Sequence, residues 1–229
     1  MNEILYTAGE YLKKLYDIYE KYPTYYALGA IGSPATEKNK ARYKVPKAPS
    51  DSFLFDCSGY AYKAIPLGWI GDRKRVYGGA DPAKDMELFN CNDILKYCKD
   101  VSSDFSDIVP SEVLYMRGHV GIYCGNGIAL ECTSKWGNCV LQSQVTNVAS
   151  SHDMPYKRKW LKHGKLPFID YGDVEYYHLH EEYTTARIGE GLIKIARRVG
   201  ITFEQIKKLN PQIKGPAYLV RLGQKVRIK

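Results

Sequence analysis

The chain has 229 residues, of which 45% are hydrophobic and 25% charged, and its formal net charge is +8. These proportions are ordinary for a folded globular protein and exclude a chain that is mainly disordered, collagen-like or coiled-coil. No run approaches the roughly 18 consecutive apolar residues of a membrane-spanning helix, and no basic segment followed by an apolar core opens the chain. We therefore expect no membrane insertion, no Sec signal peptide and synthesis in the cytoplasm.

The positive charge is concentrated at the C-terminus. Residues 1–182 carry a net charge of −1, whereas residues 183–229 carry +9. This asymmetry predicts a neutral domain at residues 1–170, a linker at 171–182 and a small basic domain at 183–229. The partner of the basic domain is expected to be anionic, such as a nucleic acid, a membrane surface or a cell-wall polymer.

The predicted elements begin with an amphipathic helix over residues 3–21, where apolar side chains recur at helical spacing until Pro23. Residues 29–52 are interrupted by Gly, Pro, Lys and Ser, which predicts a long loop. The elements expected after this loop are, in chain order, a short helix at 57–65, a loop at 70–90, a helix at 92–99, strands within 112–145, and a strand, two helices and a strand within 183–229. This order predicts an α+β protein.

Six cysteines occur, all before residue 183, and no pair has the short spacing of a zinc site. Without a signal peptide, a disulfide framework is not expected either. We therefore expect no metal and no other cofactor, and most of the thiols to be small buried apolar groups. The six are Cys57, Cys91, Cys98, Cys124, Cys132 and Cys139.

Cys57 differs from the others because it opens a predicted helix between Asp56 and Ser58. The first turn of a helix has unpaired N–H groups and the positive end of the dipole, and both lower the pKa of a thiol and favour its nucleophilic thiolate. The same N–H groups can stabilise an oxyanion. The alternative interpretation is a buried structural cysteine behind an aspartate cap.

A base for this thiol is offered by His119, which lies in a predicted hairpin that turns at residues 125–127. Even-numbered positions of the hairpin are apolar, so His119 and Glu131 are expected to share the opposite face. Glu131 would lie opposite Gly121 and diagonal to His119, within reach of long side chains. The pair can therefore form the second half of a catalytic triad, and the alternative is a solvated His–Glu pair on an exposed face.

Residues 55–59, residues 118–123 and a polar residue twelve positions after the histidine together resemble the NlpC family of papain-like cysteine peptidases, which cut the stem peptides of peptidoglycan. The resemblance extends upstream to Tyr26 and Gly29. It implies a papain-like domain, with N-terminal helices packed on an antiparallel sheet. It also implies the site: nucleophile Cys57, base His119, orienting residue Glu131, a tyrosine near the oxyanion at Tyr26, and a substrate-side wall at Asp56 and Ser58.

Two positions depart from the pattern of this family. The third catalytic position is more often histidine, and Ala30 replaces a second glycine. The segment from Gly71 to Ala80, with Trp136, is similar to phage lytic enzymes within the family.

The tail resembles a LysM module, a small strand-helix-helix-strand fold that binds glycans containing N-acetylglucosamine. The Asn210-Pro211-x-Ile213 turn and the terminal Gly-Gln-Lys are the strongest matches. The usual acidic-Thr pair is Glu190-Gly191 here. The alternative is a basic nucleic-acid module, against which the few aromatic residues argue. The resemblance implies a sugar groove at Gly189, Glu190, Gly191, Leu192, Asn210, Pro211, Gln212 and Ile213.

These interpretations predict a two-domain peptidoglycan hydrolase that cleaves an amide of the stem peptide through a thioester and is held on wall glycan by its tail. No nucleic acid is expected as a partner. The missing signal peptide leads us to expect a phage endolysin that reaches the wall after holin-type release. The alternatives are an N-acetylmuramoyl-L-alanine amidase with the same catalytic residues, and a non-catalytic wall-binding structural protein.

Overall fold

The computed structural model describes residues 4–84, 90–148, 154–172, 183–186, 190–199, 201–215, 218–220 and 224–228. The chain divides into two compact units, Met1–Val174 and Glu175–Lys229. Among the described residues, no helix has both the length and the apolar composition needed to cross a bilayer.

The first long helix, α1 (Ala8–Lys21), begins at Ala8, whereas the sequence predicted residue 3. Thr7 and Glu10 form a capping box, which satisfies free N–H groups of the first turn. The two residues before the helix belong to β1 (Tyr6–Thr7), which pairs with β12 (Ile169–Asp170). Strand pairing and the cap together fix where the helix starts.

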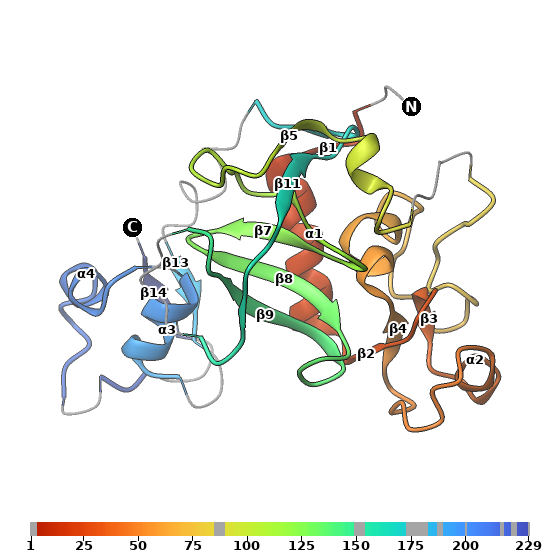
Figure 1. Cartoon of the computed structure of the whole chain (residues 1–229). Helices are drawn as coiled ribbons and strands as arrows, with labels where there is room; N and C mark the ends of the chain where they lie inside the picture. The colour runs from red at the N-terminus through yellow and green to blue at the C-terminus, as the bar shows by residue number, and fades with distance from the viewer. Residues whose placement is uncertain are drawn as a thin grey trace. The chain divides into compact units, whose positions relative to one another are not determined.

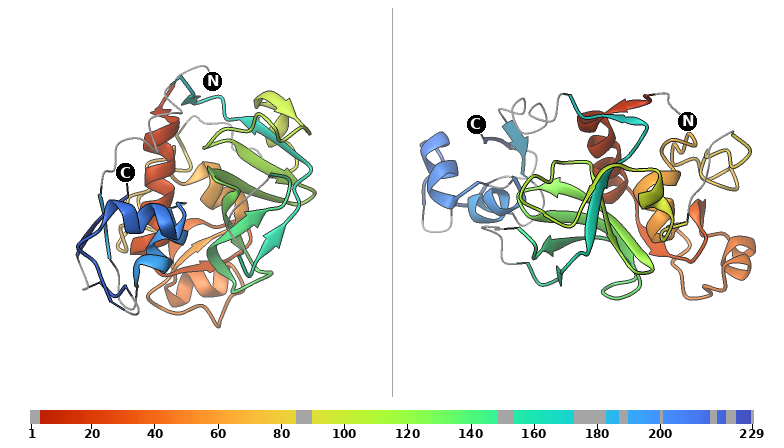
Figure 2. Two further views of the ribbon diagram at one scale, coloured as in Figure 1. Left: turned by 90° about the vertical axis from the view of Figure 1, so that its left-hand side faces the viewer. Right: turned by 45° about the horizontal axis from the view of Figure 1, so that its top comes forward.

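The centre of this unit is a seven-stranded sheet in the order β10-β9-β8-β7-β6-β11-β5. All neighbours are antiparallel except β9 and β10, which are parallel. Helix α1 lies along one face of β7–β9 (Figures 1 and 2), where Gln142 donates a hydrogen bond to Tyr16 of the helix. The strands are β5 (Lys99–Ser102), β6 (Val113–Met116), β7 (His119–Gly125), β8 (Ile128–Thr133), β9 (Cys139–Val145), β10 (Lys157–Arg158) and β11 (Lys162–Lys165).

The opposite face of the sheet is also buried. Its cluster contains Phe105, Leu114, Tyr123, Ala129, Val145 and Trp160, which are at most 7% exposed. Since both faces are covered, even and odd positions of the β7–β8 hairpin are buried alike. Trp160 and its neighbours therefore cover the face that His119 and Glu131 share.

The hairpin turns at Asn126 and Gly127, whose φ angles of 53° and 72° are the positive pair that a type I′ turn needs. The sequence predicted a three-residue loop. The structure has a two-residue turn and a bulge at Cys124, between the paired residues Tyr123 and Gly125, which has the same effect on register. Ile122 pairs with Leu130, so the predicted register between the two strands is confirmed.

A second, three-stranded sheet carries the start of the candidate site. Its order is β2-β4-β3, formed by β2 (Thr24–Tyr26), β4 (Phe53–Phe55) and β3 (Ile31–Pro34). The predicted loop at 29–52 is therefore wrong in part, because it contains β3 and α2 (Glu37–Arg42). Pairing with β4 stabilises strand β3, and the Thr36 cap stabilises helix α2.

Two short helices follow. The one predicted at 57–65 begins at Cys57, as expected, but widens into a π-helix over Gly59–Lys63 (η1). The one predicted at 92–99 is only a 3₁₀ turn over Ile94–Lys96 (η2). Strand β5 already begins at Lys99, so pairing with β11 limits this helix.

The second unit has the predicted order of strand, helix, helix and strand. It comprises β13 (Tyr183–Thr185), α3 (Leu192–Val199), α4 (Phe203–Leu209) and β14 (Lys225–Arg227), with β13 and β14 antiparallel. One face of each helix closes a small core, as the apolar spacing predicted. This core contains Ala186, Leu192, Ile195, Ala196, Ile206, Ile213 and Val226.

Candidate active site

The start of the short helix holds Cys57 through the side chain of Asp56. Asp56 Oδ1 accepts hydrogen bonds from the Gly59 N–H and, at 2.9 Å, from Ser58 Oγ. Its Oδ2 accepts the Gly29 N–H at 2.8 Å. Asp56 therefore caps the helix and ties it to the loop after β2. A Cβ at Gly59 would lie 2.1 Å from the Ala30 carbonyl oxygen, so only glycine fits there.

The Cys57 thiol is 4% exposed. Burial raises its pKa to about 12, and the negative charge of Asp56 adds to the rise, although hydrogen bonds from the backbone N–H groups of Val120 and Ser58 oppose it. The predicted lowering of this pKa by the helix start is therefore wrong, because desolvation outweighs the helix N–H groups.

Val120 follows His119, so the contact between Val120 and the sulfur places the thiol at the beginning of β7. His119 Nε2 lies 2.6 Å from Glu131 Oε2. The imidazole also stacks on Trp160, with centroids 5.6 Å apart and planes inclined by 14°. The predicted pairing of His119 with Glu131 across the hairpin is confirmed.

Glu131 is completely buried, so the alternative of a solvated pair on an exposed face is wrong. Its Oε1 accepts hydrogen bonds from Ser143 Oγ and, at 3.0 Å, from Arg158 Nε. Arg158 Nη2 lies 2.6 Å from Oε2. Burial alone would raise the pKa of Glu131, but the hydrogen bonds from His119 and Arg158 outweigh it and hold this pKa below its usual value. Glu131 is therefore an ionised acceptor at neutral pH.

An ionised carboxylate only accepts hydrogen bonds, so the proton of neutral His119 resides on Nε2. Nδ1 then carries the lone pair. In the part of the chain that the structure describes, Nδ1 has no hydrogen-bond partner. The imidazole is thus a base with its accepting nitrogen free, and Glu131 sets the tautomer.

Two residues of this network were missed by the sequence reasoning. Ser143 shares with Glu131 one face of the β8–β9 pair, so the parity of β9 could have indicated it. Arg158 comes from the two-residue strand β10, for which the sequence has no signal. Its guanidinium lies between two indoles, 4.5 Å from the Trp136 ring and 5.4 Å from the Trp160 ring.

The remaining predicted residues of this site surround the thiol. Tyr26 is half-buried, and its pKa is raised to about 12 by burial, with smaller effects of Cys57 and Asp56. The phenol is therefore a neutral donor close to the thiol. Ser58 is buried and donates its hydroxyl hydrogen bond to Asp56. Substrate contacts of Tyr26, Asp56 and Ser58 stay predictions.

The predicted sugar groove is described except for Gly189, which lies outside the described residues. Arg198 binds both carboxylate oxygens of Glu190, at 2.8 and 2.9 Å. Gly191 forms a bridge with Leu219, whose side chain is 75% exposed, and the Leu192 side chain is buried in the core.

The residues in the second half of the predicted sugar groove differ in how buried they are. Pro211 and Gln212 are exposed, whereas Asn210 and Ile213 are buried. The Asn210 side chain donates to the Ile206 and Arg227 carbonyls at 2.8 and 2.6 Å and accepts the Arg227 N–H at 2.8 Å. Its amide therefore joins α4 to β14.

No group of three or more His, Cys, Asp or Glu side chains in the described segments is arranged to hold a metal ion. The six thiols form no disulfide.

Comparison with known proteins gives one matching family and several similar solved structures. Residues 185–229 match the LysM domain family, which confirms the resemblance of the tail. Solved structures of NlpC1 and NlpC2 from Trichomonas vaginalis are 18% and 17% identical to this chain and cover 72% and 69% of it, with TM-scores of 0.38 and 0.37. The chain covers only 47% and 46% of those two proteins. No curated protein matches. Because both TM-scores lie below 0.5, the assignment of the first unit depends on its own residues.

Proposed function

We propose that the first unit is an NlpC-type, papain-like cysteine peptidase that hydrolyses an amide bond in the stem peptide of bacterial peptidoglycan. The proposal rests mainly on the hydrogen bond of 2.6 Å between His119 and the buried Glu131, at the strand end that contacts the Cys57 sulfur. The LysM match supports the bacterial wall as the place of action, with the second unit binding its glycan.

In this mechanism, His119 Nδ1 removes the thiol proton as the Cys57 sulfur attacks the amide carbon. The N–H groups at the helix start and the neutral Tyr26 phenol are the candidate donors to the oxyanion. When the tetrahedral intermediate collapses, the C–N bond breaks and His119 gives its proton to the leaving amine. Water, deprotonated by His119, then hydrolyses the thioester and returns the thiol.

Glu131 acts on the base and not on the substrate. It holds the proton on Nε2 and stabilises the imidazolium that forms at each transfer. Since burial and Asp56 raise the pKa of the Cys57 thiol, this mechanism moves the proton to His119 during the attack and requires no stored thiolate–imidazolium pair.

The test is digestion of purified peptidoglycan, with mass spectrometry of the released fragments. The wild type should release fragments with new stem-peptide termini, and Cys57→Ala should release none. Cys98→Ala is the matched control, because burial also raises the pKa of this thiol to about 12 but the site does not use it. Retained hydrolysis by folded Cys57→Ala would remove the nucleophile assignment.

The same spectra decide between the remaining functions. A terminus at the lactyl–alanine bond would identify the amidase, which the same Cys/His chemistry allows. Wall binding without any fragments would identify a non-catalytic structural protein.

The route to the wall stays a prediction. We propose release through a holin, as for a phage endolysin. Expression inside a susceptible host should cause lysis only when a holin is co-expressed, and lysis without one would contradict the proposal.

A further inference from the structure

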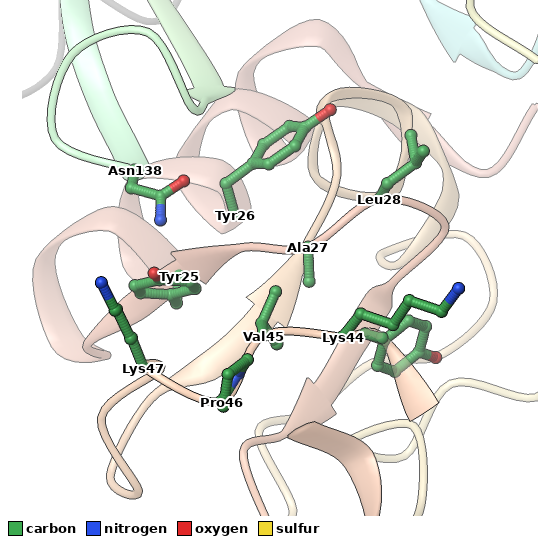
Figure 3. A pocket seen from close by; sticks show the side chains of 10 residues that line it. Tyr25, Tyr26, Ala27, Leu28, Lys44, Val45, Pro46, Lys47 and Asn138 are labelled. Atoms are coloured by element: carbon green, nitrogen blue, oxygen red, sulfur yellow. The ribbon is translucent and has the colours of Figure 1, made fainter. Parts of the chain in front are cut away.

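A shallow groove of about 420 Å³ lies beside the candidate active site (Figure 3). One wall is the end of β2 and the residues after it, from Tyr25 to Leu28, and the other is the segment Tyr43–Lys47 that follows α2. Asn138, from the β8–β9 connection, closes one end. A groove of this size suits a small ligand, such as one or two amino-acid residues.

Tyr26 lies between the groove and the thiol. It is among the residues that line the groove, and its phenol is close enough to Cys57 for their charges to interact. The wall is also fixed to the strand that carries the cysteine, because the Ala27 N–H donates to the Phe55 carbonyl at 2.8 Å. A peptide bound at Cys57 could therefore extend past Tyr26 into the groove.

Two cations lie at the groove, on either side of Val45 and Pro46 (Figure 3). Lys44 and Lys47 are exposed, and neither has a hydrogen bond or ion pair within the described residues. Lys40, in the preceding helix α2, is different: it is buried and binds Glu37 and Ser50 at 2.9 and 2.8 Å.

The backbone holds the first of these cations in an unusual conformation. Lys44 has a φ of 56°, which non-glycine residues rarely adopt. Hydrogen bonds on both sides, from the Tyr43 N–H to Asn39 and from the Val45 N–H to Lys40, each 2.9 Å, keep the turn in place. Among the described residues that line the groove, none is acidic. The groove therefore has one cation toward each end, since the Lys44 and Lys47 side chains extend in opposite directions (Figure 3), and no negative charge among its described lining residues.

We propose that this groove is a specificity subsite that binds a free carboxylate of the stem peptide beside the scissile amide, with Lys44 at one end of the groove or Lys47 at the other as its cation. The inference rests on the proposed function. A stem peptide has free carboxylates, and some bacteria convert them to primary amides, so the subsite would make the enzyme prefer ionised over amidated stems. Anionic wall polymers carry the same kind of charge, but Tyr26, which both lines the groove and lies near Cys57, favours the peptide.

The experiment compares two soluble stem peptides that differ only in having a carboxylate or a primary amide, which also removes wall polymers from the reaction. The variant Lys44→Met/Lys47→Met keeps the apolar stems and loses both charges. The matched control is Lys38→Met/Lys74→Met, which removes two exposed charges that do not line the groove. All measurements use the full chain.

The wild type should cut the carboxylate peptide with the higher kcat/KM. The double variant should raise KM for this peptide by roughly 2- to 5-fold, as expected for one solvent-exposed ion pair, with kcat unchanged and with little effect on the amidated peptide. The control variant, and the variant Lys44→Arg/Lys47→Arg that keeps both charges, should still prefer the carboxylate peptide over the amidated peptide.

Equal kcat/KM of the wild type for the two peptides would overturn the subsite. So would a double variant that loses activity equally on both, or one that loses only the binding of walls rich in anionic polymers. These outcomes differ from failure of the proposed function, in which the wild type would cut neither peptide and no purified peptidoglycan.

Discussion

Arg158 binds both carboxylate oxygens of Glu131, with Nε 3.0 Å from Oε1 and Nη2 2.6 Å from Oε2. The guanidinium touches no group that would react, and it acts through Glu131 on His119. Breaking a buried ion pair leaves an uncompensated charge, which typically costs about 3–5 kcal/mol. Arg158 is thus a positioning residue on which both the fold and the base depend.

For Arg158→Met we expect a lower kcat and a pH–rate profile whose acidic limb moves to higher pH. Arg158 is among the groups that lower the pKa of Glu131 against the effect of burial, so its removal raises this pKa. Glu131 is then protonated at a higher pH and no longer accepts the Nε2 proton. Arg158→Lys, which keeps a charge, should shift the limb less. A variant that is unstable but has an unshifted profile would reduce Arg158 to a structural role.

Glu131→Gln tests the orienting role directly. The amide can donate to Nε2 and stabilise the wrong tautomer, so kcat should fall roughly ten- to a thousand-fold while the protein stays folded. Kinetics on purified peptidoglycan and circular dichroism would measure the two effects. Activity close to that of the wild type would remove Glu131 from the triad and leave Cys57 and His119 in place.

The raised pKa of Cys57 predicts how fast the free protein is alkylated. Because burial and Asp56 raise this pKa to about 12, the rate of reaction with iodoacetamide at Cys57 should keep rising with pH through pH 9. Mass spectrometry would assign the modified cysteine. A rate that is already constant below pH 7 would show a stored thiolate–imidazolium pair, and the general-base mechanism would then be wrong.

Two buried glutamates predict opposite dependences of stability on pH. Hydrogen bonds from His119 and Arg158 hold the pKa of Glu131 below 4.5 against the effect of burial, so its contribution is lost as the pH falls through that lower value. Burial raises the pKa of Glu112 above 4.5, although His163 opposes the rise, so its contribution is lost as the pH rises. The difference in the free energy of unfolding between the wild type and Glu131→Gln should therefore shrink at acidic pH. The stability of Glu112→Gln relative to the wild type should instead increase as the pH rises from 4.5.

Urea unfolding followed by tryptophan fluorescence suits this test. All three tryptophans, Trp69, Trp136 and Trp160, belong to the first unit, so the signal reports its unfolding alone. Parallel curves for both variants across the pH range would contradict the assignment of the two carboxyl groups.

The sequence predicted those parts of the site that follow from local periodicity. Alternation along the hairpin was enough to bring His119 and Glu131 together, because register is fixed by parity and a short turn. It could not predict Arg158, which reaches Glu131 from a strand of two residues. Nor could it predict the pKa of Cys57, because the helix start is a local feature whereas burial depends on the covering of the whole site.

In the second unit, burial predicts different roles for two neighbours that the sequence assigned to one sugar groove. Asn210 is 1% exposed, and its amide makes three hydrogen bonds to α4 and β14. Asn210→Ala would leave buried backbone groups unpaired, at about 1–3 kcal/mol for each group. Gln212 is exposed and has no such bonds within the described residues.

We therefore expect Asn210→Ala to lower the melting temperature of the second unit, and Gln212→Ala to leave it unchanged while weakening the binding of glycan. Calorimetry of the full chain with a Cys57→Ala background would follow melting without digestion of the ligand. Binding would be measured by sedimentation with peptidoglycan stripped of its anionic polymers. If only unstripped walls were bound, the +9 charge of residues 183–229 would be the cause and the groove would not. DNA binding with a steep salt dependence, and none to chitin oligomers, would instead identify a nucleic-acid module.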